Sequence, residues 1–334
     1  MRVDVIDSIL VATVIAFATG CPSPSDPPDD VDAATLQPLA ANDLLFDSDR
    51  SGNHEIFVMK THGSGARQLT DDDAYENWWP RASPDRTRIL FYRSPAGDPE
   101  NYDQASLWVM DADGTDVRRL RAKGDDGWAS QGHGEWSPDG SRIAMFGTDS
   151  DSIELFVTDA NGDSPVQYTD RGGVNTDVSW SPDGQYLAFN GCPTPAGCAP
   201  ANYEIYLMAS TPFAAPTRIT TDSLADYDPY FSPDGTRVAW LVNTDPSANP
   251  LPGTAILLGR WAIRIAMIGD PATYLIDDGH INSKPAWSLD GNTIYFHRMA
   301  PPDYRFSVFR IDPDGTDLVE LTPGVAANSE HPSN

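Results

Sequence analysis

Apolar and polar residues alternate in short runs along most of this chain, and a recurring turn sequence separates the runs. The fullest copy of the turn is Trp180-Ser181-Pro182-Asp183-Gly184. Related copies occupy residues 135–140, 230–235 and 286–291, and a degraded copy lies at 81–85. Proline suits the second position of such a turn, and glycine suits the left-handed position near its end. Because alternating apolar runs lead out of the turns, the pattern predicts a repeated β-hairpin.

The repeat has a measurable period. The proline slot of the turn falls at positions 84, 138, 182, 233 and 289, where the last slot holds leucine, so the intervals are 54, 44, 51 and 56 residues. Each interval adds a third alternating run, a tight turn and a short fourth run that ends in Leu-Thr or a similar pair. Four strands joined as consecutive hairpins are typical of a β-propeller blade. The intervals exceed the usual ~40–45 residues, so we expect inserted loops.

The count of repeats predicts an all-β fold, a six-bladed β-propeller of four-stranded antiparallel blades. Residues 43–70 supply a unit that lacks its first strand, and five further units follow. The C-terminal residues 329–334 are similar to the start of a first strand, as at 77–82. We therefore expect the C-terminal strand to join the N-terminal blade and close the ring, which would remove exposed sheet edges.

The run from Ser48 to Met59, which reads Ser-Asp-Arg-Ser-Gly-Asn-His-Glu-Ile-Phe-Val-Met, carries a resemblance to a known family. Together with the repeated Ser-Pro-Asp-Gly turns, it resembles the WD40-like repeats of TolB-type propellers. The resemblance covers residues 43–334. It implies a propeller fold and says little about function.

The first twenty residues differ in character from the rest. Residues 9–18 are apolar but too few to span a bilayer, and Ala18-Thr19-Gly20-Cys21 follows them. This segment resembles the signal peptide and lipidation box of bacterial lipoproteins, with Cys21 as the lipidated residue. Plain secretion and a buried apolar segment are the alternatives. We expect a signal peptide at 1–20, a Pro/Asp/Ser-rich tether at 21–42 and the propeller at 43–334.

This organisation predicts an exported protein, lipid-anchored to the bacterial outer membrane and facing the periplasm or the surface. In an oxidising compartment, Cys192 and Cys198 would form a local disulfide. The formal net charge of −27 argues against nucleic-acid binding, which needs a basic surface. We expect a monomer whose partner is an envelope protein or a glycan, and whose contact with the membrane is through the lipid anchor only.

Blade topology predicts where function lies. The first strand of each blade lines the central channel, so the second-to-third and fourth-to-first loops share the face opposite the Ser-Pro-Asp-Gly turns. The long insertions all fall in these two loop classes, at residues 94–105, 121–132, 191–202 and 245–260. Binding sites on rigid scaffolds are commonly built by loops. Neutral variation in loop length is the alternative explanation.

Two sets of polar positions recur in the first strands. Five residues before the apolar residue that leads into the turn lie Asn77, Gln131, Asn175, Asp226, Asn282 and Ser329. Three residues before it lie Trp79, His133, Asp177, Asp228, Lys284 and His331. Residues of equal parity share one face of a strand, so both sets are expected to form rings near the channel mouth. The first set could satisfy backbone groups between blades or bind a ligand, and the second is a candidate recognition surface.

Motifs for catalysis are missing from the sequence. It contains no Gly-x-Ser-x-Gly nucleophile motif and no His-Glu-x-x-His zinc motif. The sequence therefore favours a non-catalytic, envelope-tethered binding or scaffold propeller, without a cofactor, that recognises a protein or glycan at the channel mouth and the long-loop face. The alternative is a propeller enzyme, a lyase or hydrolase, with a divalent metal at the mouth. Its weak candidate ligands are His133, Asp177, Asp228 and His331.

Overall fold

Antiparallel hairpins account for nearly all regular structure in the computed structural model, which describes residues 37–148, 152–192, 203–247, 259–300 and 304–334. These residues belong to one folded unit, Leu36–Asn334. Among them the single helical element is a 3-10 turn, η1 (Asp125–Gly127). No helix in the described part of the chain has the length and apolar character needed to cross a membrane. The expected signal peptide, Cys21 and most of the tether lie outside the described residues.

The strands form four sheets. The first sheet has the order β24 (Ser329–Ser333), β1 (Asp43–Ser48), β2 (Glu55–Lys60) and β3 (Arg67–Gln68). The second contains β4 (Tyr75–Ala82), β5 (Arg88–Pro95), β6 (Ser106–Asp111) and β7 (Arg118–Arg121). The third contains β8 (Gln131–Trp136), β9 (Arg142–Thr148), β10 (Ile153–Asp159), β11 (Val166–Gln167), β12 (Val174–Trp180), β13 (Tyr186–Cys192), β14 (Glu204–Ala209) and β15 (Thr217–Arg218). The fourth contains β16 (Ala225–Phe231), β17 (Arg237–Asp245), β18 (Arg260–Met267), β19 (Thr273–Ile276), β20 (Ile281–Trp287), β21 (Ile294–Ala300), β22 (Arg305–Ile311) and β23 (Val319–Glu320).

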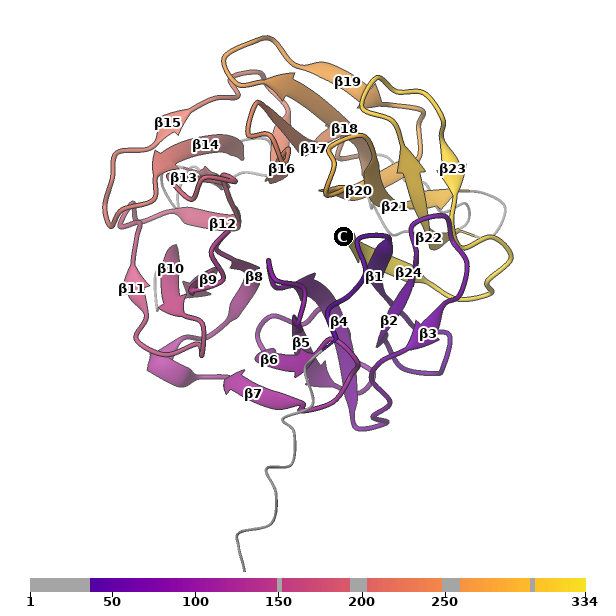
Figure 1. Ribbon diagram of the computed structural model, residues 1–334. Coiled ribbons are helices and arrows are strands. Elements are labelled where there is room, and N and C mark those ends of the chain that lie inside the picture. Colours follow the sequence, from indigo (N-terminus) through magenta and orange to yellow (C-terminus); the bar gives the residue numbers. More distant parts are fainter. Residues whose placement is uncertain (1–36, 149–151, 193–202, 248–258, 301–303) are drawn as a thin grey trace, which may run out of the picture. The chain divides into compact units, whose positions relative to one another are not determined.

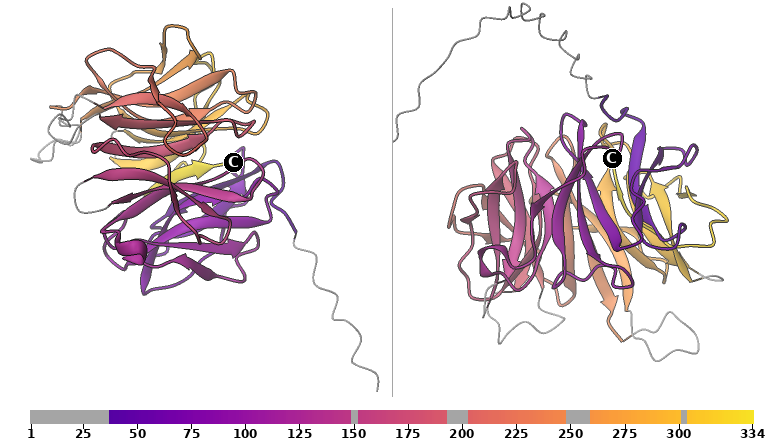
Figure 2. Two further views of the ribbon diagram at one scale, coloured as in Figure 1. Left: turned by 90° about the vertical axis from the view of Figure 1, so that its left-hand side faces the viewer. Right: turned by 90° about the horizontal axis from the view of Figure 1, so that it is seen from below.

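Each eight-stranded sheet consists of two antiparallel groups of four strands. A single parallel bridge joins the groups, Ile153 with Val174 in one sheet and Trp261 with Ile281 in the other. Within the folded unit, the groups are arranged around a common centre, with β4, β8, β12, β16, β20 and β24 nearest to it (Figure 1). We call these six the inner strands. Figure 2 shows that the strands run between the two faces of the unit, so each strand has one end at each face.

The repeated turns have the geometry that the sequence predicts. The turn glycines Gly140, Gly184, Gly235 and Gly291 have φ values of 70°, 69°, 70° and 71°. In the turn after β8, the Ser137 hydroxyl donates to Asp139 Oδ1 at 2.6 Å, and Gly140 N–H donates to the Ser137 carbonyl at 2.8 Å. The serine and aspartate side chains thus make hydrogen bonds within the turn.

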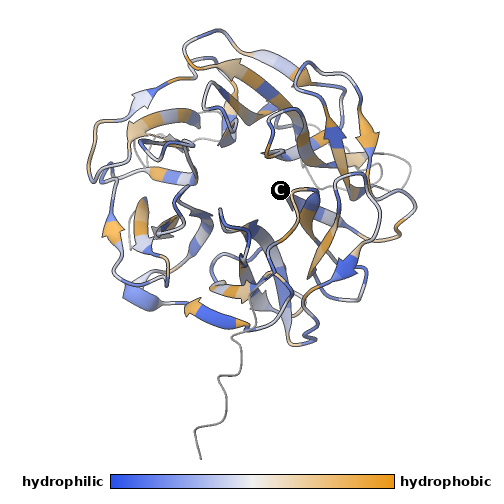
Figure 3. Cartoon of the chain, in the orientation of Figure 1, coloured by the Kyte–Doolittle hydropathy of each residue, from blue (hydrophilic) through white to orange (hydrophobic). Residues whose placement is uncertain are grey.

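The core consists of apolar clusters that lie between neighbouring four-stranded groups. One cluster brings Leu45 and Ile56 of the first sheet against Ile89 and Phe91 of the second. Another packs Leu44 and Phe46 against β21 and β22 through Tyr295 and Val308. Apolar residues recur in the strands of all four sheets (Figure 3). Burial between sheets therefore supplies the stabilising area for strands whose outer members are only two to four residues long.

The C-terminal strand lies against the N-terminal sheet. β24 pairs antiparallel with β1 through Ser329 with Ser48 and Ser333 with Leu45. All five residues of β24 are buried.

We predict that a chain ending at Asn328 loses substantial stability. The edge of β1 would be exposed and five buried residues would be lost, so the melting temperature should fall by roughly 10 °C, at ~2–4 °C per kcal/mol. Thermal unfolding followed by circular dichroism measures this. The matched control carries a short polar extension after Asn334 and should melt like the wild type. Equal melting of the truncated chain would contradict the prediction.

Candidate functional site

Every inner strand contains one residue whose backbone is left-handed. These residues are Trp79, His133, Asp177, Asp228, Lys284 and His331, with φ values of 59°, 53°, 49°, 48°, 57° and 46°. The pairing register of each inner strand shifts at or beside this position. The six are therefore β-bulge residues, and they are the second set that the sequence singled out. We call them the bulge residues.

The bulge separates the two sets that were expected to share one face. An extra residue in a strand breaks the simple alternation of faces, so equal parity no longer means the same face on both sides of it. Asn77, Asn175, Asp226 and Asn282 are fully buried and do not line the cavity described below. Gln131 and Ser329 are buried as well.

The first set joins neighbouring groups of strands. Asn175 Nδ2 donates to Glu154 Oε2 at 2.9 Å and to the Ile153 carbonyl at 3.1 Å. Asn77 Nδ2 makes the equivalent bond to Glu55 Oε2 at 2.8 Å. These contacts favour the structural alternative, in which the set satisfies buried polar groups between blades.

Asp226 stands in this set as a carboxylic acid, whereas four of the other members carry amides and Ser329 carries a hydroxyl. Its Oδ1 accepts a hydrogen bond from Trp240 Nε1 at 2.8 Å, while its Oδ2 has no hydrogen-bond partner among the described residues. Burial raises the pKa of Asp226 to about 7. A proton on this group therefore stabilises the folded chain over the acidic range.

A cavity of about 490 Å³ opens where the inner strands begin. Five bulge residues line it: His133, Asp177, Asp228, Lys284 and His331. Tyr227, Trp261 and Phe306 contribute aromatic walls, and Glu100 and Tyr102 reach it from the loop after β5. The Ser-Pro-Asp-Gly turns follow the opposite ends of the inner strands, so the cavity lies on the long-loop face. Two of the four insertions there, at 191–202 and 245–260, lie mostly outside the described residues.

The strands β8, β12, β16 and β20 supply one side of the cavity. His133 Nδ1 contacts Asp177 Oδ1 and lies 3.7 Å from Asp228 Oδ1. Lys284 Nζ forms an ion pair with Asp228 Oδ2 at 2.7 Å. The Tyr102 hydroxyl lies 2.7 Å from His133 Nε2 and holds the ring. One imidazole, two carboxyl groups and one ammonium group thus meet in a buried space.

Burial sets the protonation of this side. It lowers the pKa of His133 well below its ordinary value, and the neighbouring positive charge of Lys284 lowers it further. Burial and the adjacent Asp228 carboxylate raise the pKa of Asp177 well above its ordinary value. Burial acts to lower the pKa of Lys284, but Asp228 and Asp177 outweigh it and raise that pKa. These shifts favour the neutral imidazole of His133 and the protonated carboxyl of Asp177.

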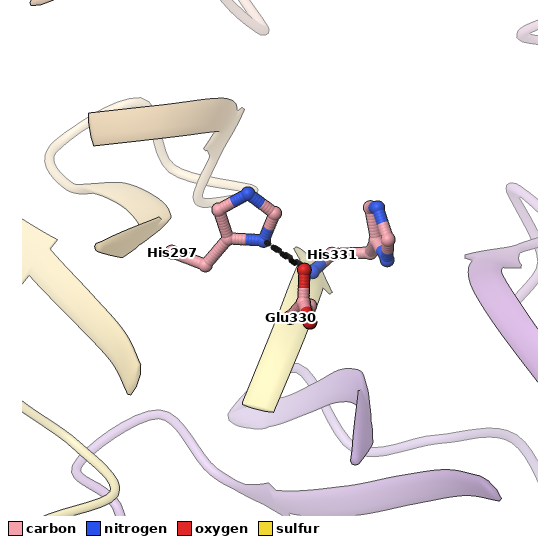
Figure 4. A group of neighbouring side chains, drawn as sticks. All are labelled: His297, Glu330 and His331. Atoms are coloured by element: carbon pink, nitrogen blue, oxygen red, sulfur yellow. Dashed lines mark hydrogen bonds and ion pairs between the residues drawn. The ribbon is translucent and has the colours of Figure 1, made fainter. Parts of the chain in front are cut away.

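The other side of the cavity is built by β21 and β24. Figure 4 shows His297 facing Glu330, with His331 turned away from them. His297 Nδ1 accepts the backbone N–H of His331 at 3.0 Å and lies 3.9 Å from Glu330 Oε2. Burial lowers the pKa of His297 and raises that of Glu330, each well away from its ordinary value.

His331 is oriented by a buried carboxylate. Its Nδ1 lies 2.8 Å from Asp47 Oδ1, while His54 Nδ1 lies 3.0 Å from Asp47 Oδ2. Burial acts to raise the pKa of Asp47, but the two histidines outweigh it and lower that pKa. Conversely, the hydrogen bond to Asp47 outweighs burial and raises the pKa of His54 to about 9.

Trp79 lies behind the lining residues. Its ring packs against His133 and His331, with centroid distances of 4.4 and 5.0 Å. Lys284 Nζ and Arg81 Cζ both lie over the ring, at 4.6 and 4.2 Å from its centroid. Only 1% of Trp79 is exposed, so it supports the site rather than presenting a surface to a ligand.

A cluster that the sequence reasoning missed lies below Trp79, toward the turn face. Arg81 Nε bonds Glu135 Oε1 at 2.6 Å, and Arg81 Nη2 donates to the Tyr230 hydroxyl at 2.9 Å. These three residues each stand one position before the apolar residue that leads into the turn. Counting one residue back, as well as three and five, would have found them.

Other lining residues carried no pattern. Glu100 and Tyr102 lie in an insertion, and His297 and Glu330 do not belong to either counted set.

Cys192 ends β13 and is buried, whereas Cys198 lies outside the described residues, so the disulfide stays a prediction.

With this geometry established, comparison with known proteins shows a TolB-type β-propeller fold. TolB from Acinetobacter baumannii superposes with a TM-score of 0.66 at 16% identity, over 87% of this chain and 66% of that one. A putative TolB from Agrobacterium tumefaciens gives a TM-score of 0.60 at 16% identity, over 86% and 96% of the two chains. A chain of a nidogen/laminin complex gives 0.63 at 12% identity, over 87% and 97%.

Sequence comparison is more limited. No protein-family model matches the chain. An uncharacterized protein of Agrobacterium fabrum is 31% identical over 30% of this chain and 34% of its own length. A TolB homolog of Chlorobium luteolum is 28% identical over 44% of this chain and 31% of its own length. The match thus spans about a third of the length of these curated relatives.

Replacing Asp226 by asparagine should flatten the pH dependence of stability. Because the folded-state pKa of about 7 lies above the ordinary aspartate value of 3.8, the wild type loses stability as pH rises from about 4 to about 7. At ~1.4 kcal/mol per pKa unit, this loss is on the order of 4 kcal/mol. The Asp226→Asn variant would keep an acceptor for Trp240 and remove the loss, so it should be the more stable protein at pH 7.

Urea unfolding at several pH values between 4 and 8 measures the effect. Asp270→Asn, at an exposed carboxylate in the turn after β18, is the matched control and should keep the wild-type slope. An unchanged slope for Asp226→Asn would contradict the prediction.

Proposed function

We propose that this chain is a non-catalytic binding propeller that recognises a protein partner at the channel mouth, with a positively charged partner side chain entering the cavity. The observation that carries this proposal is the composition of the cavity. Four carboxyl groups line it, from Glu100, Asp177, Asp228 and Glu330, against the single ammonium group of Lys284. Aromatic walls beside these groups suit the apolar stem of a lysine or arginine.

The electrostatics support a cationic guest. Buried carboxyl groups that hold protons can ionise when a positive charge enters, because the guest compensates the cost of burying the anion. The net charge of −27 adds long-range attraction for a basic partner. A neutral glycan would use the aromatic walls and hydrogen-bond to the carboxyl groups but would gain no charge pairing there, so we favour a protein.

The structural comparisons are compatible with this class of function. One similar propeller fold, with a TM-score of 0.63, was solved in a nidogen/laminin complex, where it is part of a protein–protein assembly. Identities of 12–16% limit that support to the fold.

We also propose six blades and a ring that the C-terminal strand closes. The pairing of β24 with β1 supports closure, as does the apolar cluster between β1–β2 and β21–β22. The four-stranded groups, two in each large sheet, support the blade count. Export, lipid anchoring at Cys21, a Cys192–Cys198 disulfide and a monomeric state complete the proposal.

Charge reversal at the mouth should abolish capture of basic peptides. A random heptapeptide phage library panned against the purified protein should return sequences enriched in lysine and arginine. Glu100→Lys places a like charge at the entrance and should weaken binding of such a peptide at least tenfold by fluorescence anisotropy.

Glu320→Lys, at an exposed position on β23, is the charge-matched control and should bind like the wild type. Equal loss of peptide binding in both variants would mean that the net charge of the protein, and not the cavity, accounts for the effect. Recovery of uncharged peptides, or binding only on a neutral glycan array, would overturn the assignment of a basic protein partner.

Replacing Cys21 by serine should abolish incorporation of a labelled fatty acid when the full chain is expressed in a bacterial host, because lipidation needs the thiol. Cys192→Ser should retain the label. A fully labelled Cys21→Ser protein would exclude the anchor.

A further inference from the structure

Three bulge residues on consecutive inner strands bring metal-ligating atoms together. His133, Asp177 and Asp228 come from β8, β12 and β16, and one ligand atom of each lies within 4.8 Å of the others. Their left-handed backbones turn the three side chains toward the same point. Their side chains line the cavity and are only 7%, 9% and 3% exposed, so bulk water does not compete freely for these atoms.

Two of the facing atoms have no hydrogen bond among the described residues. These are His133 Nδ1 and Asp228 Oδ1, on side chains that are only 7% and 3% exposed. The contact of His133 Nδ1 with Asp177 lacks hydrogen-bond geometry. Buried polar atoms without partners are costly, and a bound ion is one of the groups that satisfy them.

The surrounding contacts suit an ion. A metal-bound histidine usually donates its other ring N–H to a neighbouring acceptor. The Tyr102 hydroxyl, 2.7 Å from His133 Nε2, can accept that bond and leave the Nδ1 lone pair directed at the ion. Lys284 pairs with Asp228 Oδ2, which leaves Oδ1 as the ligand oxygen.

His297, Glu330 and His331 form a second group of possible metal ligands (Figure 4). It differs from the first group in the hydrogen bonds that its ring nitrogens already make. His297 Nδ1 accepts the backbone N–H of His331, so the neutral ring carries its proton on Nε2 and has no lone pair to offer there. His331 Nδ1 is engaged with Asp47. One nitrogen of each histidine in this group is therefore already engaged, while His331 Nε2 has no hydrogen bond among the described residues and lies 3.6 Å from Glu100 Oε1.

We propose that His133, Asp177 and Asp228 form a site for one divalent transition-metal ion of the zinc or manganese class. An imidazole nitrogen with two carboxylates suits these ions, whereas calcium and magnesium prefer oxygen ligands alone. Water or a ligand in the cavity would complete the coordination. This site shares Asp177 and Asp228 with the cavity proposed above for a basic partner, but its test needs no partner, so the two proposals can fail separately.

The test uses the full chain, purified without a histidine tag and dialysed against a chelator. Isothermal titration with ZnCl₂ and with MnCl₂ should show one site per chain for at least one ion. His133→Gln and Asp228→Asn should each weaken that binding at least tenfold. The matched control, His297→Gln, removes a histidine of the second group and should bind like the wild type.

Anomalous diffraction from wild-type crystals grown with the ion provides a measurement that does not depend on the folding of a variant. A peak between His133 and Asp228 is expected. The proposal would be overturned if neither ion bound stoichiometrically. A peak at His297 and Glu330 instead, or tighter binding of Ca²⁺ than of either ion, would also overturn it.

Discussion

A left-handed residue in every inner strand is the constraint on which the channel mouth depends. Such a backbone costs a non-glycine residue about 1–2 kcal/mol, so the surrounding structure must hold it in place. Direct contacts do so at two positions: Trp79 N–H donates to Asp47 Oδ1 at 3.2 Å, and His331 N–H donates to His297 Nδ1. The left-handed conformation directs one side chain per inner strand toward the centre, where five of the six side chains line one cavity.

The charges at the mouth follow from this convergence. Acids and bases that would be separate on a regular strand are buried together, and each adjusts its protonation to its neighbours. The two histidines beside Asp47 lower its pKa, whereas burial raises the pKa of Asp177 and that of Glu330. Carboxyl groups whose pKa is raised by burial can ionise when a positive guest enters.

The sequence predicted the bulge set because the Ser-Pro-Asp-Gly turn is a reliable ruler. Counting three residues back found all six positions, because the bulge recurs two or three residues before the end of every inner strand. The count did not reveal the bulge, so the set five residues back was expected at the mouth, although Asn77 and Asn175 join neighbouring groups of strands. Glu100 and Tyr102 were missed because an insertion has no period, and Arg81 because a third count was not made.

The sequence by itself determined the order of hairpins, the turn geometry and the positions of the inner strands, because these depend on residues a few positions apart. Only the tertiary structure decided which polar groups meet. Arg81 and Tyr230 are 149 residues apart in the sequence, and His331 and Asp47 are 284 apart. Contacts of this kind, and the protonation states that follow from them, arise only when sheets from distant parts of the chain exclude water between them.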